Sequence, residues 1–240
     1  MLETSLKNQL ASYLTKISKP VELVVTTDQS SSSEQLRSLA DEIGAMSQLI
    51  SVQETKGNAG RKPLMSVKGE SSEVQFAGVP LGHEFTSLVL ALLQSGGHPV
   101  KLSEEDIEII QSIDQKLHFE SYVSLSCQSC PTVVQALNMM AVLNPNIVHT
   151  MIDGALFQEE VTEKNVMAVP SVFLNGESFS QGRVEITDIL AKLDTGNNEK
   201  VVEKLNQKPT FDSLIIGAGP AGASAAIYSA RKGLKTGIVA

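Results

Sequence analysis

The sequence predicts an α/β protein made of two tandem units, each a mixed sheet with flanking helices, followed by a truncated β-α-β unit. Three observations predict this. The order of strand-like and helix-like apolar runs in the first hundred residues returns in the next hundred. Both cysteines of the chain, Cys127 and Cys130, stand one helical turn apart directly after a strand-like run. A glycine-rich turn, residues 217–222, follows an apolar strand near the end.

The composition is that of a folded protein with more than one domain. The chain has 240 residues, of which 42% are hydrophobic and 19% are charged, as in ordinary globular proteins. Its net charge of -8 argues against nucleic acid as the main partner, because phosphate contacts need a concentrated basic surface. No run reaches the roughly 18 apolar residues that cross a membrane, and the start lacks a signal peptide's apolar core. We therefore expect a cytoplasmic protein.

The first unit, residues 1–100, is expected to follow the order αβαβββα and contains no cysteine. Leu6, Leu10 and Leu14 stand at near-helical spacing and predict an amphipathic first helix. Strands are expected at 21–26, 49–53, 64–67 and 73–77, and further helices over 36–46 and 85–94.

The second unit, residues 101–196, repeats this order around the cysteine pair. Its expected helices are residues 107–117, 127–141, 159–165 and 186–193, of which the second opens at Cys127. Its expected strands are residues 121–125, 147–152 and 171–174 and a strand near Phe179. Alignment of the halves pairs Pro63 with Pro170 and residues 28–31 with the cysteine motif. We interpret this as an internal duplication; a single larger α/β domain is the alternative.

The last part is expected to be a polar linker, residues 197–210, and the start of a nucleotide-binding domain, residues 211–240. The candidate binding residues are Gly217, Ala218, Gly219, Pro220, Ala221 and Gly222. This GxGxxG turn lies between an apolar strand and a helix of small residues, the context typical of a Rossmann-type β-α-β unit. Glycines there permit a tight turn and close approach of a pyrophosphate. A Gly-rich turn without a ligand is the alternative.

The spacing of Cys127 and Cys130 suits reversible disulfide chemistry. Residues i and i+3 of a helix lie about 5–6 Å apart, within the span of a disulfide. A strand followed at once by a helix places Cys127 at or beside the helix N-cap, where free amides and the helix dipole favour a thiolate. Cys127 is therefore the expected nucleophile and Cys130 the resolving cysteine.

A zinc site is the competing interpretation of the cysteine pair. A structural zinc usually needs a second close pair of ligands, and the four histidines of the chain supply none. They are His83, His98, His118 and His149. We expect no metal, and each histidine is expected to be exposed or satisfied by hydrogen bonds.

The second unit resembles the thioredoxin fold. The resemblance rests on the order strand, CxxC, helix, and on Val169-Pro170 followed by another strand. It implies that Pro170 is a cis proline that faces the disulfide. X-Pro bonds are seldom cis by default, so this expectation depends on the family pattern alone.

The whole chain resembles the N-terminal part of the AhpF family, the flavin-dependent reductase component of alkyl hydroperoxide reductase. The segments SLSCQSCP, NVMAVPSVFLNG and GPAGASAAIYSARKG carry most of the likeness. The resemblance implies that electrons pass from NADH to FAD, to a second CxxC in C-terminal flavin and NADH domains, to Cys127 and Cys130, and finally to the disulfide of a peroxiredoxin, the AhpC component of alkyl hydroperoxide reductase. It also implies a homodimer when the protein is full-length. The start of the FAD domain by itself is not expected to bind FAD.

Glu84 of the first unit matches an acidic residue that this family places near the CxxC, where a carboxylate can modulate the proton affinities of the thiols. The alternative role for Glu84 is stabilisation of a helix start by its charge. Two other functions remain open for the chain: a general glutaredoxin-like protein disulfide oxidoreductase, and a non-enzymatic redox-sensing module. The unit without cysteines is expected to serve as a scaffold or docking surface.

Overall fold

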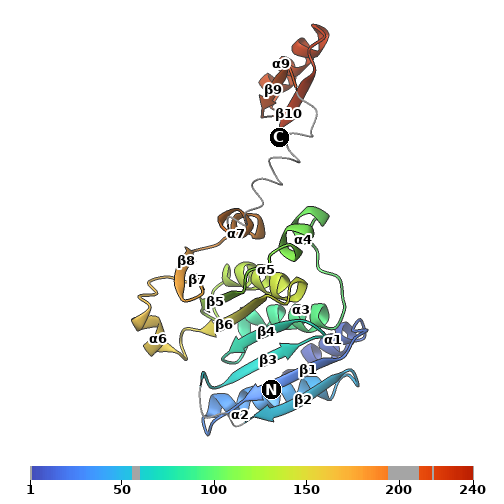
Figure 1. Cartoon of the computed structure of the whole chain (residues 1–240). Coiled ribbons are helices and arrows are strands. Elements are labelled where there is room, and N and C mark those ends of the chain that lie inside the picture. The colour runs from blue at the N-terminus through green and yellow to red at the C-terminus, as the bar shows by residue number, and fades with distance from the viewer. Residues whose placement is uncertain (1, 56–59, 194–210, 218, 240) are drawn as a thin grey trace. The chain divides into compact units, whose positions relative to one another are not determined.

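The computed structural model describes residues 2–55, 60–193, 211–217 and 219–239. Contacts between residues divide the chain into two compact units, residues 1–193 and residues 194–240, and from here on these are called the first and the second unit. The two units expected from the sequence, residues 1–100 and the part of 101–196 up to residue 193, are called the two halves of the first unit. Each unit is described by itself (Figure 1). The expected linker, residues 197–210, and Ala218 lie outside the described residues.

The first unit is built on one mixed eight-stranded sheet with the strand order β2-β1-β3-β4-β6-β5-β7-β8. Its strands are β1 (Val21–Thr26), β2 (Ile50–Thr55), β3 (Leu64–Lys68), β4 (Glu73–Ala77), β5 (Leu117–Val123), β6 (Ile147–Asp153), β7 (Ser171–Leu174) and β8 (Glu177–Gln181). The parallel pairing of β4 with β6 makes one continuous sheet from the two halves of the unit (Figure 1).

Two cores lie on opposite faces of this sheet, because successive residues of a strand point to opposite sides. The helices are α1 (Thr4–Leu14), α2 (Ser31–Gly44), η1 (Gly82–Glu84), α3 (Phe85–Ser95), α4 (Glu104–Gln111), α5 (Cys130–Leu143), α6 (Gln158–Glu163) and α7 (Ile186–Lys192). The large core takes buried residues from α1 to α5 and from α7. In β5, Phe119 and Val123 belong to the large core, whereas Tyr122 belongs to a small core that α6 helps to cover.

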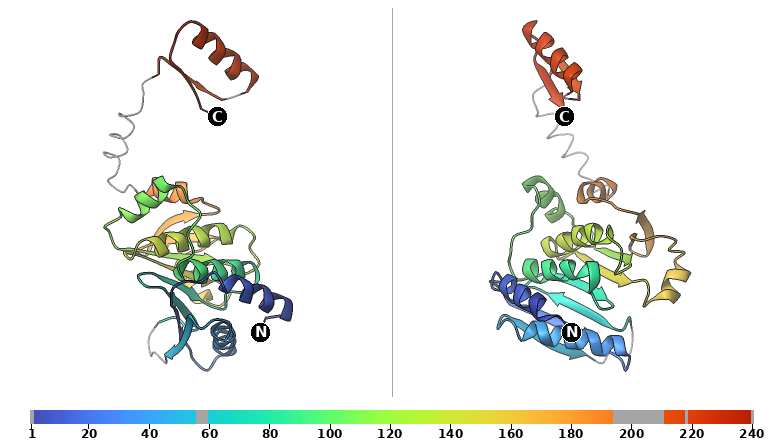
Figure 2. Two further views of the ribbon diagram at one scale, coloured as in Figure 1. Left: turned by 90° about the vertical axis from the view of Figure 1, so that its right-hand side faces the viewer. Right: turned by 180° about the vertical axis from the view of Figure 1, so that it is seen from behind.

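The two halves of the sheet repeat one topology. Within each half, the first two strands pair in parallel, the first and third are antiparallel, and the third and fourth are antiparallel. Both prolines that the sequence alignment paired, Pro63 and Pro170, follow cis peptide bonds. Helices α3 and α5 pack side by side where the halves meet (Figure 2). Because one compact unit holds both halves, the domain boundary at residue 100 stays a prediction.

The structure corrects the expected elements just before the cysteines. The expected helix over 107–117 is α4, which begins earlier, at Glu104, and ends at Gln111. Ser103 caps it by accepting a hydrogen bond from the Asp106 amide, and acidic residues fill its first turn. Leu117 instead opens β5, because Leu117 and Phe119 are buried and pair with the parallel strand β6.

The helix expected to open at Cys127 begins at Cys130. Pro131 stands in its first turn, a position that suits proline because the amide hydrogen it lacks would have no partner inside the helix. Pro131 therefore favours a helix that begins at Cys130. Cys127 lies in the loop between β5 and α5.

The second unit contains β9 (Ser213–Ile216), α9 (Pro220–Arg231) and β10 (Thr236–Val239). The two strands pair in parallel, in the order β-α-β that the sequence predicted. Across all the residues with a described position, no helix is both long and apolar enough to span a membrane.

Candidate functional site

Cys127 and Cys130 form a disulfide, with their Cα atoms 5.5 Å apart. The two sulfurs differ in access, because Cys130 is fully buried in the large core and Cys127 is only partly buried. The amide of Cys130 donates a hydrogen bond to Sγ of Cys127 at 3.1 Å. The first amide of α5 thus faces the more accessible sulfur, which is the arrangement that stabilises an attacking thiolate.

The loop from β5 to α5 holds Cys127 in place by short-range hydrogen bonds. The amide of Cys127 donates to the carbonyl of Ser124 at 2.9 Å. The hydroxyls of Ser124 and Ser126 lie 3.0 Å apart and hydrogen-bond to each other. Ser129 Oγ lies 3.5 Å from Cys127 Sγ, so a side chain inside the CxxC motif contacts the reactive sulfur.

Glu84 is fully buried at the end of η1, and its segment touches the loop that leads to Cys127. The amide of His83 donates to the carbonyl of Leu125 at 3.0 Å. Gly82 has φ +58°, and a Cβ there would lie 2.6 Å from the same carbonyl oxygen, so only glycine permits this close approach. The segment of the first half that carries Glu84 thus lies against the cysteine loop of the second half.

Burial raises the pKa of Glu84 to about 7, and the nearby Ser87 hydroxyl lowers it only in part. Neither carboxyl oxygen has a hydrogen-bond partner among the described residues. The side chain also makes no capping bond to α3. A carboxyl group in this state exchanges a proton near neutral pH, although the roles of Glu84 and Pro170 stay predictions. Pro170 is buried and cis, and its carbonyl accepts a hydrogen bond from the Gly182 amide at 2.8 Å.

A second buried polar cluster lies between β5, β6 and α5. His149 is fully buried; its Nδ1 is 2.6 Å from Oδ1 of Asn138, and its Nε2 is 2.9 Å from Oγ of Ser121. Burial, with a smaller effect from His118, lowers the pKa of His149 to about 3, so the ring is neutral. The expectation of a satisfied histidine is met here, but sequence reasoning found neither partner.

Sequence reasoning missed a third cluster, in which Arg61 of the first half binds acidic residues of the second. Its guanidinium donates to Glu160 through Nε and Nη2, at 2.9 and 2.6 Å, and to Glu120 at 2.6 Å. The hydroxyl of Tyr122 donates to the same Glu160 carboxylate at 2.9 Å. Opposite charges lower the pKa of Glu160 and raise that of Arg61, so the cluster ties α6 to the first half.

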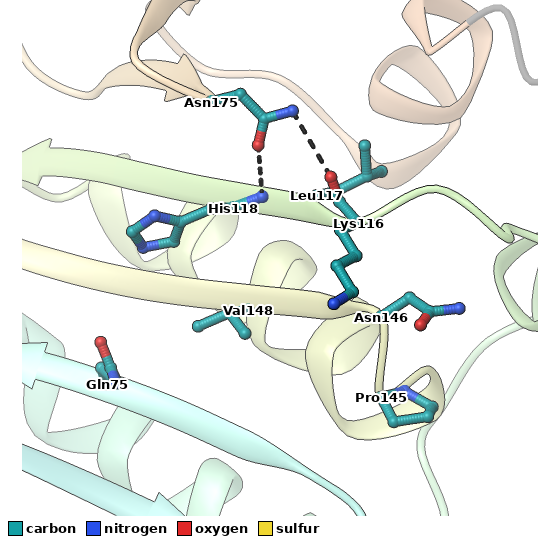
Figure 3. Close-up of a pocket in the computed structure, with 8 residues that line it drawn as sticks. All are labelled: Gln75, Lys116, Leu117, His118, Pro145, Asn146, Val148 and Asn175. Carbon is teal, nitrogen blue, oxygen red and sulfur yellow. Dashed lines mark hydrogen bonds between the residues drawn. The ribbon is translucent and has the colours of Figure 1, made fainter.

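A pocket of about 450 Å³ opens at the other end of β5 from the cysteine loop (Figure 3). It is lined by Gln75, Lys116, Leu117, His118, Pro145, Asn146, Val148 and Asn175. The side chain of Asn175 makes its hydrogen bonds to the backbone. It accepts a hydrogen bond from the amide of His118 and donates one to the carbonyl of Lys116. The Asn175 side chain therefore ties the turn between β7 and β8 to the start of β5.

The described glycines of the Gly-rich turn leave open space at two positions and allow a close approach of strand and helix at the third. Gly217 has φ +100°, and a Cβ on Gly217 or Gly219 would meet open space. A Cβ on Gly222 would clash with the carbonyl oxygen of Gly217, so the strand and helix approach closely only because this residue is glycine. Pro220 and Ala221 begin α9 behind the turn. These residues fit a bound dinucleotide, whereas no described group of three potential ligands could hold a metal ion.

Comparison with known proteins places this geometry in context. A family model described as a thioredoxin domain matches residues 118–195. The chain is 53% identical to the F subunits of alkyl hydroperoxide reductase from Pseudomonas putida and from Escherichia coli (strain K12), over all of this chain and 46% of each relative. It is also 51% identical to a protein of Bacillus subtilis (strain 168) named NADH dehydrogenase, of which it covers 47%. The chain thus spans about half the length of these relatives.

Solved structures agree with this assignment. The N-terminal NTD_N/C domain of the alkylhydroperoxide reductase AhpF from Enterococcus faecalis (V583) matches with a TM-score of 0.73 and 27% identity, over 80% of this chain and 100% of that one. A protein disulfide oxidoreductase from Aeropyrum pernix K1 shares the fold with a TM-score of 0.71 at 21% identity, over 82% of this chain and 96% of that one. The chain therefore has a thioredoxin-like α/β fold and matches, over its whole length, the N-terminal part of the AhpF family of alkyl hydroperoxide reductases.

Proposed function

We propose that residues 1–193 carry out thiol–disulfide exchange and relay two electrons from a flavoprotein reductase to the disulfide of a peroxiredoxin, the AhpC component of alkyl hydroperoxide reductase. One observation carries the proposal: the start of α5 holds a disulfide with one accessible and one buried sulfur. The whole of this chain matches 46% of an AhpF relative, which gives that disulfide its context. In this role the chain supports the removal of peroxides.

The proposed steps need only the two cysteines and the partner's disulfide. In the reduced protein, the Cys127 thiolate attacks one sulfur of the partner, a mixed disulfide forms, and the first partner thiolate leaves. Cys130, as a thiolate, then attacks Sγ of Cys127. The Cys127–Cys130 disulfide forms, the second partner thiolate leaves, and two electrons have passed to the partner. The proton that Cys130 gives up ends on one partner sulfur, which becomes a thiol, and the other partner sulfur leaves as the thiolate that balances the charge of the original Cys127 thiolate.

Glu84 is proposed to modulate the proton affinities of these thiols. Its burial and its pKa of about 7 allow it to hold or release a proton near neutral pH, and the exchange requires Cys130 to lose one. The contact between His83 and Leu125 keeps it beside the cysteine loop. This gives the first half a defined task although it contains no cysteine.

We also propose that the two halves are tandem thioredoxin-like units and that the first serves as a scaffold. The repeated strand order and the matching positions of Pro63 and Pro170 support a duplication. The Arg61 cluster and the β4–β6 pairing hold the halves together. Full activity without the first hundred residues would contradict the scaffold role.

The Gly-rich turn is proposed to belong to the FAD-binding domain of the full-length protein. Gly217, Gly219 and Gly222 would let a pyrophosphate approach the start of α9. FAD, when bound there, supplies electrons that it receives from NADH. Within this chain the task of residues 211–239 is to bind and orient that group. We also propose that the full-length protein is a homodimer and that it lies in the cytoplasm.

The decisive experiment mixes the reduced chain with an oxidised two-cysteine peroxiredoxin and counts thiols on both proteins over time. Rapid transfer of both electrons supports the proposal. Cys127→Ser should abolish transfer, and Cys130→Ser should accumulate the mixed disulfide. Slow transfer to the peroxiredoxin with fast exchange toward glutathione would instead indicate a general protein disulfide oxidoreductase. Absence of exchange toward either would indicate a redox-sensing module.

A further inference from the structure

Ser129 is placed unlike the other serines of the cysteine loop. It stands at the N-cap position of α5, where a serine side chain normally accepts a hydrogen bond from an amide one turn ahead. Here its backbone is helical, with φ -92° and ψ -16°, and its side chain makes no capping bond. Ser124 and Ser126 hydrogen-bond to each other, which leaves Ser129 as the serine hydroxyl that contacts the reactive sulfur.

The direction of the contact between Ser129 and Cys127 follows from the chemistry of the disulfide. A disulfide sulfur carries no hydrogen, so across the 3.5 Å from Oγ to Sγ the hydroxyl is the donor. The amide of Cys130 donates to the same sulfur. Cys127 Sγ therefore accepts hydrogen bonds from two donors, one in the backbone and one in a side chain.

We propose that Ser129 is a catalytic residue of thiol–disulfide exchange, whose hydroxyl donates a hydrogen bond to the Cys127 thiolate of the reduced protein. The inference deepens the proposed function, because it takes Cys127 as the attacking thiol. A hydrogen bond to an ionised acceptor is about twice as strong as one between neutral groups, so the contact strengthens when the thiolate forms. Ser129 is half-buried, which limits competition from water.

Loss of this donor should raise the pKa of the Cys127 thiol by about one unit, a tenfold change in the ionisation equilibrium. The effect on rate has a sign that depends on pH. At a pH below the pKa of the Cys127 thiol, the variant without the donor has a tenfold smaller fraction of thiolate. Its thiolate is more basic and therefore roughly threefold more nucleophilic, so the net rate of exchange falls about threefold. Above the pKa in both proteins, the more basic sulfur makes the variant about threefold faster. A purely structural defect would slow exchange at every pH.

The test compares Ser129→Ala, Ser129→Thr and Gln128→Ala in the 240-residue chain. Each change is made in wild type and in a Cys130→Ser background, where Cys127 is the last remaining thiol. Thiolate absorbance against pH gives the pKa, and the rate of exchange with a small disulfide gives the pH profile. Ser129→Ala should raise the pKa by about one unit and produce the rate crossover. Thr keeps the hydroxyl and should restore both, and Gln128, which is exposed and makes no described contact with the sulfur, is the matched control.

Two results would overturn the role of Ser129: an unchanged pKa in Ser129→Ala, or an equal shift in Ser129→Thr. These readouts do not involve the peroxiredoxin. A shifted pKa with no electron transfer from wild type to the peroxiredoxin would therefore support Ser129 and refute the proposed partner. Normal transfer with an unshifted pKa would refute Ser129 and leave the partner in place.

Discussion

The buried His149 makes the stability of the protein depend on pH in a way that a single substitution can isolate. Its pKa falls from the ordinary value of 6.5 to about 3 because burial disfavours the charged ring. Between these two values the unfolded state binds a proton that the folded state does not. The stabilising contribution of neutral His149 is therefore present above pH 6.5 and is lost as the pH falls toward 3.

The magnitude follows from that window. Acidification from pH 7.5 to pH 5 crosses about 1.5 pH units below the unfolded pKa, which corresponds to a loss of about 2 kcal/mol from His149. Glu84 opposes this, because its raised pKa makes the folded state bind the extra proton over much of the same range. Its contribution is roughly 2 kcal/mol in the other direction. The wild-type protein alone can therefore show a nearly flat profile that hides both groups.

The assay is urea unfolding of wild type and His149→Gln at pH 7.5 and pH 5, with stability compared between the two proteins at each pH. At pH 7.5 the variant should lose about 1–3 kcal/mol, because glutamine cannot bond to Ser121 and Asn138 together as the ring does. At pH 5 that loss should shrink by about 2 kcal/mol. Ile147→Val, a buried change on the same strand, should cost about 1 kcal/mol at both values. An equal loss at both pH values in His149→Gln would refute the reasoning.

Three further predictions concern other parts of the chain. Arg61→Ala removes the donor that Glu120 and Glu160 share and leaves Glu120 with Lys164, whose Nζ lies 3.7 Å away. It should cost roughly 1–3 kcal/mol in urea unfolding, and Arg61→Lys should recover part of this loss; a loss under about 0.5 kcal/mol for Ala would count against the cluster. The folded-state pKa of Glu84 lies above its unfolded value, so the protonated carboxyl stabilises the folded protein at low pH. Between pH 4.5 and pH 7, the free energy of unfolding of wild type should therefore fall by up to about 3 kcal/mol relative to that of Glu84→Gln. Parallel stability curves for the two proteins would contradict this. Gly222→Ala places a methyl group against the Gly217 carbonyl and should speed amide hydrogen exchange in α9. The exchange rates of residues 60–193 should stay unchanged. Equal protection of α9 in wild type and variant would show that the turn tolerates a side chain.

The sequence predicted most of the elements, because the patterns that define them are local. Alternating buried residues such as Leu23 and Val25 mark a strand, and the turn from Ile216 to Gly222 marks a strand-to-helix connection. The cysteine pair and the proline before β7 likewise stand at fixed distances along the chain. These signals were enough for the order of elements, which the structure shows. They were also enough for the α/β class and the likeness to AhpF, which the comparisons confirmed.

Local signals failed where long-range pairing decided the outcome. Residues 107–117 read as one helix, yet the pairing of Leu117 with Ile147 in the parallel strand makes the end of that segment a strand. The start of α5 is a different case, because a local signal was overlooked. The helix begins at Cys130 and not at Cys127, since Pro131 suits a first helical turn better than a later one.

What only the tertiary structure decided is which polar groups meet away from water. Arg61 and Glu160 are 99 residues apart in the chain, and no periodicity connects them; the joining of the two half-sheets through β4 and β6 brings them together. The same joining buries Glu84 and sets its segment against the cysteine loop. The sequence by itself determined the fold class and the reactive pair, since these depend on local spacing. The proton affinities around that pair depend on burial, and burial exists only once distant segments have packed.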